Sequence, residues 1–376
     1  MIRRKKSKFR FFSKIVLIVN VIAALLLLIS YLAPFIDPNT FWPVAFFGLA
    51  YSVFLLLNIV FILYWLIRSP RFALISAFCI LIGFKSLTGF IGFRESTAIT
   101  VPKSSQNFIR IMTYNVHNFK QYGDDNDEFT KDQILDIIRK EQPDVLCIQE
   151  FYSRPKGEYN FKKSISEIMD SQHYYFVPNT ENGFESIGMA IFSKLPILKK
   201  GRIPFKDVKG NEALFVDLKF KGQPFRVYNV HFQSIRFQPE DYKFLKEVTK
   251  EIDTDVKSSR RIGSRLKQAF LKRSDQVKIV KKHTDECKSP YIVAGDFNDT
   301  PVSYTVNTMS EGLHNSFRKK GSGLGITYNG DFPNFQIDYI LASPEFEIRN
   351  YLITDKKLSD HYPVRSDVEL TGRRPY

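Results

Sequence analysis

The sequence has few cysteines, and this excludes two kinds of stabilisation. Its 376 residues include three, Cys79, Cys147 and Cys287. Three dispersed thiols exclude a disulfide framework and a cysteine-based zinc site. Cys79 and Cys147 lie in apolar runs, where a small buried apolar side chain is the simpler interpretation. The redox compartment therefore stays open.

Acidic residues are nearly absent from the first hundred residues. Asp37 and Glu95 stand there against 11 of the 54 Lys and Arg. This segment carries a net charge of +9, and the rest of the chain carries the other +6 of the formal +15. A modest basic excess suits an anionic substrate, but it equally suits the surface of an anionic membrane. Composition does not choose between the two.

Long apolar runs occupy the acid-poor segment, at about residues 15–36, 41–67 and 72–93. About 20 apolar residues in a helix cross the hydrocarbon core of a bilayer, so residues 1–94 are predicted to form a transmembrane anchor. The first run has no clear cleavage site and a second run follows at once, which favours an anchor over a signal peptide. Lys85 interrupts the third run, and a charge near mid-span is costly. Two or three spans are therefore expected.

The basic residues of short loops predict how the anchor is oriented. The leader between Arg3 and Arg10, together with Arg68 and Arg71 between the second and third runs, is expected on the cytoplasmic side. We therefore expect a multi-pass protein of the cell (inner) membrane. With three spans the rest of the chain lies on the outer, periplasmic side. If the third span fails, the rest is cytoplasmic.

The remainder of the chain is predicted to be one α/β domain. Residues 95–107 are polar and indicate a linker, and residues 108–376 alternate strands with helices. Apolar residues at helical spacing predict a helix at 131–140, and residues 233–289 are charged and mostly helical. The predicted strands lie at 108–115, 144–149, 174–177, 188–192, 214–220, 225–232, 291–295, 336–342 and 346–354. This length supports a two-sheet core.

Polar side chains repeatedly follow the apolar strands, at the ends where open sheets display ligands. Taken singly, each has an ordinary explanation as a loop acid, a turn residue or a structural histidine. The residues are Asn115, Glu150, Asn229, His231, Asp296, Asn298, Asp338, Asp360 and His361. A site that assembles all of them is the more economical interpretation.

These motifs resemble one family. Gly-Asp-Phe-Asn at 295–298, Ile-Asp-Tyr-Ile-Leu at 337–341 and Ser-Asp-His at 359–361, together with Tyr-Asn at 114–115 and Gln-Glu at 149–150, are similar to the endonuclease/exonuclease/phosphatase superfamily. The resemblance covers about residues 109–370. It implies a four-layer α/β/β/α sandwich of two facing mixed sheets and a metal-dependent phosphoric diester hydrolase. Gln336 departs from the pattern, because many members carry Arg there.

The resemblance implies a metal site. Glu150 is similar to the principal ligand of the family, with Asn115 beside it and Asp360 contributing from the opposite side. The expected cofactor is Mg²⁺, with Mn²⁺ able to substitute, because a hard cation prefers oxygen ligands and offsets the charge of the diester.

The resemblance also implies catalytic roles. Asp296 and Asn298 are similar to the pair that orients the attacking water and holds the phosphate or a second metal. His361 and Asp338 are similar to the family dyad that assists water attack. His231 would donate to a phosphate or leaving-group oxygen. We expect Asn229, Asn298 and His231 to contact the substrate.

The substrate class stays open, because it depends on loops around a shared centre. The basic residues between Arg260 and Lys282 favour a nuclease-like enzyme that binds nucleic acid. A phospholipid- or phosphoinositide-directed enzyme is the alternative, since the anchor holds the domain at a bilayer. An apolar rim would support it, and its candidates are Phe151, Tyr152, Phe232 and Phe237. An inactive membrane-bound interaction module is a third reading, which the intact site residues disfavour.

Overall fold

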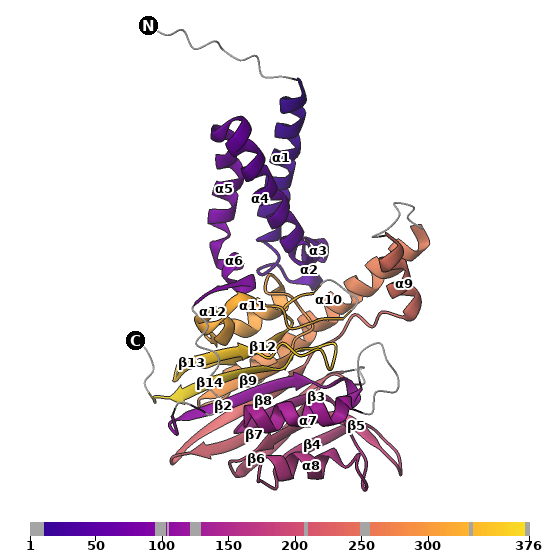
Figure 1. Cartoon of the computed structure of the whole chain (residues 1–376), viewed down its shortest axis with the longest axis vertical. Coiled ribbons are helices and arrows are strands. Elements are labelled where there is room, and N and C mark those ends of the chain that lie inside the picture. Colours follow the sequence, from indigo (N-terminus) through magenta and orange to yellow (C-terminus); the bar gives the residue numbers. More distant parts are fainter. Residues whose placement is uncertain are drawn as a thin grey trace. The chain divides into compact units, whose positions relative to one another are not determined.

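The chain divides into two compact units (Figure 1). The computed structural model describes residues 11–94, 103, 105–120, 129–206, 210–248, 256–330 and 334–372. One unit comprises Met1–Leu87 and Val302–Tyr304, and the other comprises Thr88–Pro301 and Thr305–Tyr376. Most of the predicted linker at 95–107 lies outside the described residues.

The N-terminal region is helical. Its elements are α1 (Phe11–Ser30), α2 (Pro38–Phe41), α3 (Pro43–Leu49), α4 (Tyr51–Arg68), the 3₁₀ turn η1 (Pro70–Phe72), α5 (Ala73–Ile82) and α6 (Phe84–Phe90). Among the described residues, α1 and α4 are long and apolar enough to cross a membrane, and the bent pair at residues 70–82 and 84–90 adds a third if it counts as one span. The second predicted run, 41–67, is divided between α3 and α4, because Ala50 leaves the helical conformation.

Polar side chains link these helices to one another. Asn20 on α1 donates to the Ser76 hydroxyl at 2.7 Å and accepts from the Trp65 indole at 2.9 Å. Asn58 on α4 donates to the Ala23 carbonyl at 3.0 Å. Away from water an unsatisfied polar group is costly, so such bonds hold helices together. Asn20, a polar interruption in the first apolar run, is thereby explained.

The C-terminal unit contains two six-stranded sheets. The first sheet has the order β13-β14-β2-β3-β5-β4 and the second has the order β10-β12-β9-β8-β7-β6. Both are mixed, because β2 with β3 and β8 with β9 are parallel and the other pairs are antiparallel. A third sheet is the short pair β1 (Ile91–Phe93) and β11 (Ser322–Leu324).

All nine predicted strands are present. The first sheet comprises β2 (Phe108–Asn115), β3 (Val145–Ser153), β4 (His173–Glu181), β5 (Ser186–Ser193), β13 (Phe346–Ile353) and β14 (Val364–Leu370). The second sheet comprises β6 (Ile197–Pro204), β7 (Glu212–Phe220), β8 (Gln223–His231), β9 (Tyr291–Asp296), β10 (His314–Asn315) and β12 (Asp338–Ala342). Of these, β6, β10 and β14 were not predicted.

The predicted four-layer sandwich is confirmed. Apolar residues of both sheets, such as Ile111 and Cys147 from the first and Val216 and Ile292 from the second, form one buried cluster. A second cluster packs α7 (Thr130–Glu141) and α8 (Phe161–Ile168) on the other face of the first sheet. Figure 1 shows α10 (Val256–Asp285) beside the second sheet. The remaining helices are η2 (His117–Phe119), α9 (Pro239–Val248), α11 (Tyr304–Ser310) and α12 (Ser316–Lys320).

A buried ionic network joins β2, β14 and α7. Arg110 pairs with both carboxylate oxygens of Asp367, at 2.6 and 2.9 Å, and donates to the Glu141 carbonyl at 2.7 Å. Arg365 pairs with the Glu141 carboxylate at 2.5 Å. The Arg110 and Arg365 side chains are almost completely buried. The loss of one anion would therefore leave a desolvated charge uncompensated.

Replacing Asp367 with Asn should destabilise the domain by roughly 3–5 kcal/mol, the usual cost of breaking a buried pair. Thermal unfolding of the full chain in detergent measures the change. The control is Glu347→Gln, which removes an exposed partner of Arg349 and should cost about 0–1 kcal/mol. Equal effects of the two substitutions would contradict a structural role for the network.

Candidate active site

One set of polar side chains collects where strands of both sheets end. The first sheet contributes Asn115 at the end of β2 and Glu150 in β3, and Asp360 and His361 just before β14. The second sheet contributes His231 at the end of β8, Asp296 at the end of β9 and Asp338 at the start of β12. The residues predicted to converge are therefore brought together.

Asn115 connects the two halves of this cluster. Its side-chain amide donates to Glu150 at 3.3 Å and to Asp296 at 3.2 Å. Its Oδ1 accepts from the backbone N–H of His117 at 3.2 Å. Residues 117–119 all have positive φ, a conformation that is uncommon outside glycine and that concentrates at functional sites.

His117 is a site residue that the sequence predictions missed. Its Nδ1 lies 3.6 Å from Glu150 and 3.7 Å from Asp360, between the two carboxylates. The contact with Glu150 raises the pKa of His117 above its usual value. Its place two residues after Asn115, in a chain with only six histidines, was the signal available in the sequence.

A β-bulge directs Glu150 into the site. The pairing of β3 with β5 shifts between Ile148 and Phe151, and Glu150 has a φ of 49°. Such bulges re-aim a side chain beside active sites. Burial raises the pKa of Glu150, but the hydrogen bond with His117 and the nearby histidines outweigh it and lower the pKa to about 2. Glu150 is therefore an anion at neutral pH.

Asp296 lies at the centre of the second sheet's contribution. Its Oδ2 is 3.6 Å from His231 Nε2 and 3.7 Å from His361 Nε2. Burial raises the pKa of Asp296 to about 6. Gly295 allows β8 and β9 to lie this close, because a Cβ there would sit 2.0 Å from the Val230 carbonyl oxygen.

His231 has unused hydrogen-bonding capacity. The side chain is buried, and neither ring nitrogen makes a hydrogen bond within the described part of the chain. Its Nε2 is also 4.0 Å from Glu150. A buried polar group without a partner is costly, so this imidazole is suited to bonding a ligand oxygen.

Asn298 is held against Asp296 by the turn after β9. Its backbone N–H donates to Asp296 Oδ1 at 2.8 Å, and its side-chain amide donates to Asp296 Oδ2 and to the Phe232 carbonyl, both at 3.0 Å. Its φ of 52° is again in the left-handed region. The predicted pair of Asp296 and Asn298 is thus one hydrogen-bonded unit.

His361 and Asp338 form a buried dyad. His361 Nδ1 lies 2.9 Å from Asp338 Oδ2, and its Nε2 faces Asp296. Burial lowers the pKa of His361, but three surrounding carboxylates outweigh this effect and raise the pKa well above its usual value. They belong to Asp338, Asp296 and Asp360.

Hydrogen bonds fix the two segments that carry the dyad. The Ser359 hydroxyl donates to the Asn115 carbonyl at 2.8 Å, which ties the His361 segment to β2. The Thr327 hydroxyl accepts from the N–H of Asp338 at 3.0 Å. The dyad is therefore attached to both sheets.

The acidic residues suit a hard divalent cation. Glu150 and Asp360 both contact His117 Nδ1, so their carboxylates face one another across a position now taken by an imidazole that carries positive charge when protonated. A cation bound by oxygen ligands satisfies the same electrostatic demand. Within the described residues, Asp296, Asp338 and His361 form a second group, with ligand atoms all within 4.8 Å of one another.

Asn229 lies outside the ligand-facing set. Its amide donates to the carbonyls of Ile148 and Ala190, at 3.0 and 2.9 Å, and its oxygen accepts from Gln149 at 2.6 Å. The side chain is completely buried. The predicted substrate contact is therefore wrong, because the polar atoms of Asn229 are committed to joining the two sheets.

Gln336, where many family members carry Arg, is buried, and both atoms of its amide lack a hydrogen bond within the described residues. An apolar rim is also wrong for Phe151 and Phe232, because both side chains are completely buried in the core.

Several basic side chains of α10 are engaged in internal ion pairs. Arg261 and Arg265 both contact the buried Asp241 carboxylate, at 2.6 and 2.9 Å. Arg273 is itself buried, pairs with Asp299 at 3.0 Å and donates to the Gln233 carbonyl at 2.9 Å. Arg261 and Arg265 therefore attach α10 to α9, and Arg273 attaches it to the loops after β8 and β9. Arg273 contributes no free positive surface, and the charges of Arg261 and Arg265 are partly offset by Asp241.

Comparison with known proteins places these residues in context. The family model described as endonuclease/exonuclease/phosphatase family matches residues 112–361. A model for a domain of unknown function matches residues 13–90. No curated protein matches the sequence.

Several solved structures are similar to this chain. An endonuclease/exonuclease/phosphatase from Beutenbergia cavernae is 20% identical with a TM-score of 0.51, and the match covers 70% of this chain and 72% of that chain. The human Nocturnin catalytic domain with bound sulfate is 19% identical with a TM-score of 0.48, over 75% and 97% of the two chains. A mannosyl-6-phosphatase from Bacteroides thetaiotaomicron is 17% identical with a TM-score of 0.46, over 69% and 99%.

Proposed function

The chain belongs to the endonuclease/exonuclease/phosphatase family, and from this premise we propose that it is a membrane-anchored, Mg²⁺-dependent phosphodiester hydrolase. The family makes it a hydrolase of phosphate esters. The observation that carries the proposal is that side chains from both sheets meet in one cluster. Asn115 contacts both Glu150 and Asp296, and His361 contacts both Asp296 and Asp338.

Glu150, Asn115 and Asp360 are proposed to hold the metal, with Mn²⁺ able to replace Mg²⁺. Their donors are carboxylate and amide oxygens, the ligands that Mg²⁺ prefers. The low pKa of Glu150 keeps this ligand ionised. When bound, the cation would offset the negative charge of the diester and make a coordinated water more acidic.

The remaining residues are proposed to act on water and phosphate. Asp296, hydrogen-bonded to Asn298, is placed to orient a water and accept its proton. His361, held by Asp338, is proposed to stabilise the charge that develops on the phosphorus oxygens. His231, whose ring nitrogens make no hydrogen bond within the described residues, would donate to a phosphate or leaving-group oxygen.

Turnover of a diester by the purified full-length chain tests the proposal. We expect hydrolysis with Mg²⁺ or Mn²⁺ and none after chelation. DNA, RNA, sphingomyelin and phosphoinositide vesicles are assayed in parallel, with a simple aryl phosphodiester as a substrate that favours neither class. Absence of metal-dependent turnover of every one of these would instead support the inactive interaction module.

Two classes of substrate are proposed, nucleic acids and phospholipids. A nuclease-like activity was favoured by the basic residues of α10, and the internal pairing of Arg261, Arg265 and Arg273 weakens that support. A phospholipid or phosphoinositide is favoured by the apolar helices that precede the domain. Strongly salt-dependent binding of polynucleotide would favour the nuclease.

A topology reporter tests the proposed localisation in the cell (inner) membrane. If the bent pair crosses the bilayer as a third span, a reporter fused after Val101, outside the described residues, should signal the outer (periplasmic) compartment. Fusions after Asp37 and after Arg71 serve as outer and cytoplasmic controls. A cytoplasmic signal at Val101 would contradict three spans and place the catalytic domain inside the cell.

A further inference from the structure

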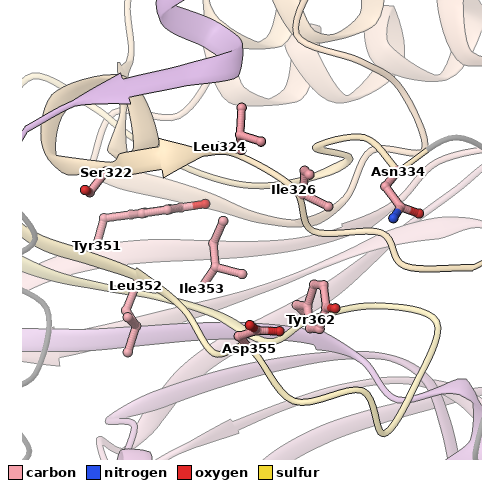
Figure 2. A pocket seen from close by; sticks show the side chains of 9 residues that line it. All are labelled: Ser322, Leu324, Ile326, Asn334, Tyr351, Leu352, Ile353, Asp355 and Tyr362. Carbon is pink, nitrogen blue, oxygen red and sulfur yellow. The ribbon is translucent and has the colours of Figure 1, made fainter.

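A pocket of about 420 Å³ lies beside the candidate active site, within the C-terminal unit (Figure 2). It is bounded by β11 and the loop after it on one side, and by β13 and the loop toward β14 on the other. Its lining residues are Ser322, Leu324, Ile326, Asn334, Tyr351, Leu352, Ile353, Asp355 and Tyr362. The mechanism proposed above uses none of them.

The lining combines apolar side chains with three polar ones, Ser322, Asn334 and Asp355. Six of the nine side chains are leucine, isoleucine or tyrosine. The Leu324 side chain is 64% exposed, although burial of a leucine side chain is favourable in free energy. Concave apolar sites of some hundreds of Å³ with a few polar groups are typical of ligand binding. The pocket therefore has the size and chemistry of a site for a hydrocarbon group.

The Tyr351 hydroxyl lies among the apolar side chains of the lining. Figure 2 shows the Tyr351 hydroxyl pointing between Leu324 and Ile353. Tyr351 is 5% exposed, and its hydroxyl has no hydrogen bond of ordinary geometry within the described residues. The Gln336 amide lies close enough to interact with this hydroxyl, although neither group makes a hydrogen bond of ordinary geometry within the described residues. A buried hydroxyl in this state favours a ligand that brings an acceptor, such as the carbonyl oxygen of an acyl ester.

The pocket adjoins the last apolar helix of the chain. β1 begins at Ile91, the residue after α6 ends, and Ile91 pairs directly with Leu324. The Gly325 N–H donates to the carbonyl of Phe90, the last residue of α6, at 2.9 Å. One residue spans at most about 3.6 Å. The β11 side of the pocket therefore lies next to the residues that directly follow α6.

The pocket also shares a wall with the catalytic segment. The Tyr362 N–H donates to the Thr327 carbonyl at 2.6 Å, and the Asn329 N–H donates to the Asp360 carbonyl at 2.8 Å. Neighbouring residues on extended backbone point to opposite faces. Tyr362 accordingly lines the pocket, while His361 contacts Asp338 in the site.

We propose that this pocket binds an acyl chain of a bilayer lipid, with the Tyr351 hydroxyl donating to the acyl carbonyl. Leucine, isoleucine and tyrosine side chains make up most of its lining residues, its strand β11 pairs with the residues that directly follow α6, and it carries a buried hydroxyl that can donate to the carbonyl of an acyl group. The proposal rests on the proposed membrane anchoring and is independent of the proposed hydrolysis.

Photocrosslinking of the full chain in lipid nanodiscs tests the proposal without an activity readout. The probe is phosphatidylcholine with a diazirine on one acyl chain, and adducts are mapped by mass spectrometry. We expect adducts on the segments around residues 322–326 and 351–353, as well as on α1 and α4. Adducts on the anchor helices alone would overturn the proposal.

Variants make the test specific to the pocket. Leu324→Glu, which charges the mouth, and Ser322→Trp, which fills it, should each abolish the pocket adducts and leave those on α1 unchanged. Leu198→Glu is the matched control, because Leu198 is 60% exposed on β6. Leu324→Met should retain the adducts. Undiminished pocket adducts in both of the first two variants would contradict the assignment, and unchanged thermal unfolding verifies that each variant is folded.

Discussion

Replacing His361 with alanine is expected to lower kcat by roughly two to four orders of magnitude, the range for loss of general acid–base or electrostatic assistance. The imidazole lies 2.9 Å from Asp338 and 3.7 Å from Asp296. Three carboxylates hold its pKa above the usual value, which favours the protonated, cationic form. Removing it takes away the group proposed to stabilise the charge that develops on the phosphate.

Kinetics of the purified variant on a simple phosphodiester measure this effect, with circular dichroism as the test of folding. His173→Ala is the matched control, because His173 is exposed at the start of β4 and should leave kcat unchanged. Asp338→Asn keeps the shape of the dyad but removes the charge that stabilises the imidazolium, so it should also lower kcat. A decrease of less than about tenfold in His361→Ala would remove His361 from the catalytic role.

Replacing Glu150 with Gln is expected to raise the Mg²⁺ concentration needed for half-maximal activity. The loss of a residue that merely supports a metal ligand typically weakens metal binding by about 10–100-fold. Loss of the ligand itself should raise the required Mg²⁺ concentration by at least as much. The substitution removes a carboxylate charge and preserves the volume of the side chain. Because the pKa of Glu150 is lowered to about 2, the native ligand is fully ionised in the assay, and the variant removes a full charge.

Activity measured over a Mg²⁺ titration, together with direct metal binding by calorimetry, reports the effect. Glu167→Gln on α8 is the control, since Glu167 is an exposed residue that pairs with Lys163 on the same helix. Unchanged activity of Glu150→Gln at low Mg²⁺ would contradict the ligand assignment. Recovery of much of the activity at saturating Mg²⁺ would support it.

Much of the fold was predictable because its strands are buried on the inner face. Continuous apolar runs such as 145–148 and 292–294 stand out from the sequence by composition alone. β6 escaped prediction because it is an edge strand with Lys199, Lys200 and a glycine, whose pattern resembles a loop. β14 escaped because Arg365 and Asp367, both buried in the ionic network, interrupt its apolar pattern.

The site residues that lie at or near the ends of strands could be predicted from the sequence. Glu150, Asp296, Asp338 and His361 follow or begin buried strands, and the two sheets bring them together. His117 escaped because its position depends on three consecutive residues with positive φ, which no periodicity reports. Asn229 was misassigned because a strand-end amide looks the same in the sequence whether it binds a ligand or a neighbouring carbonyl.

The hydrogen bonds of Asn229 help to keep the two sheets in a fixed position relative to one another. The first sheet and the segment before β14 carry Asn115, Glu150 and Asp360, and the second sheet carries His231, Asp296 and Asp338. Asn229 joins β8 to carbonyls of β3 and β5 across a largely apolar interface. Any slippage of one layer over the other would move the two groups of reacting side chains apart together. Substitutions that repack the interior should therefore misalign these two groups of side chains, and turnover should be lost well before the protein unfolds.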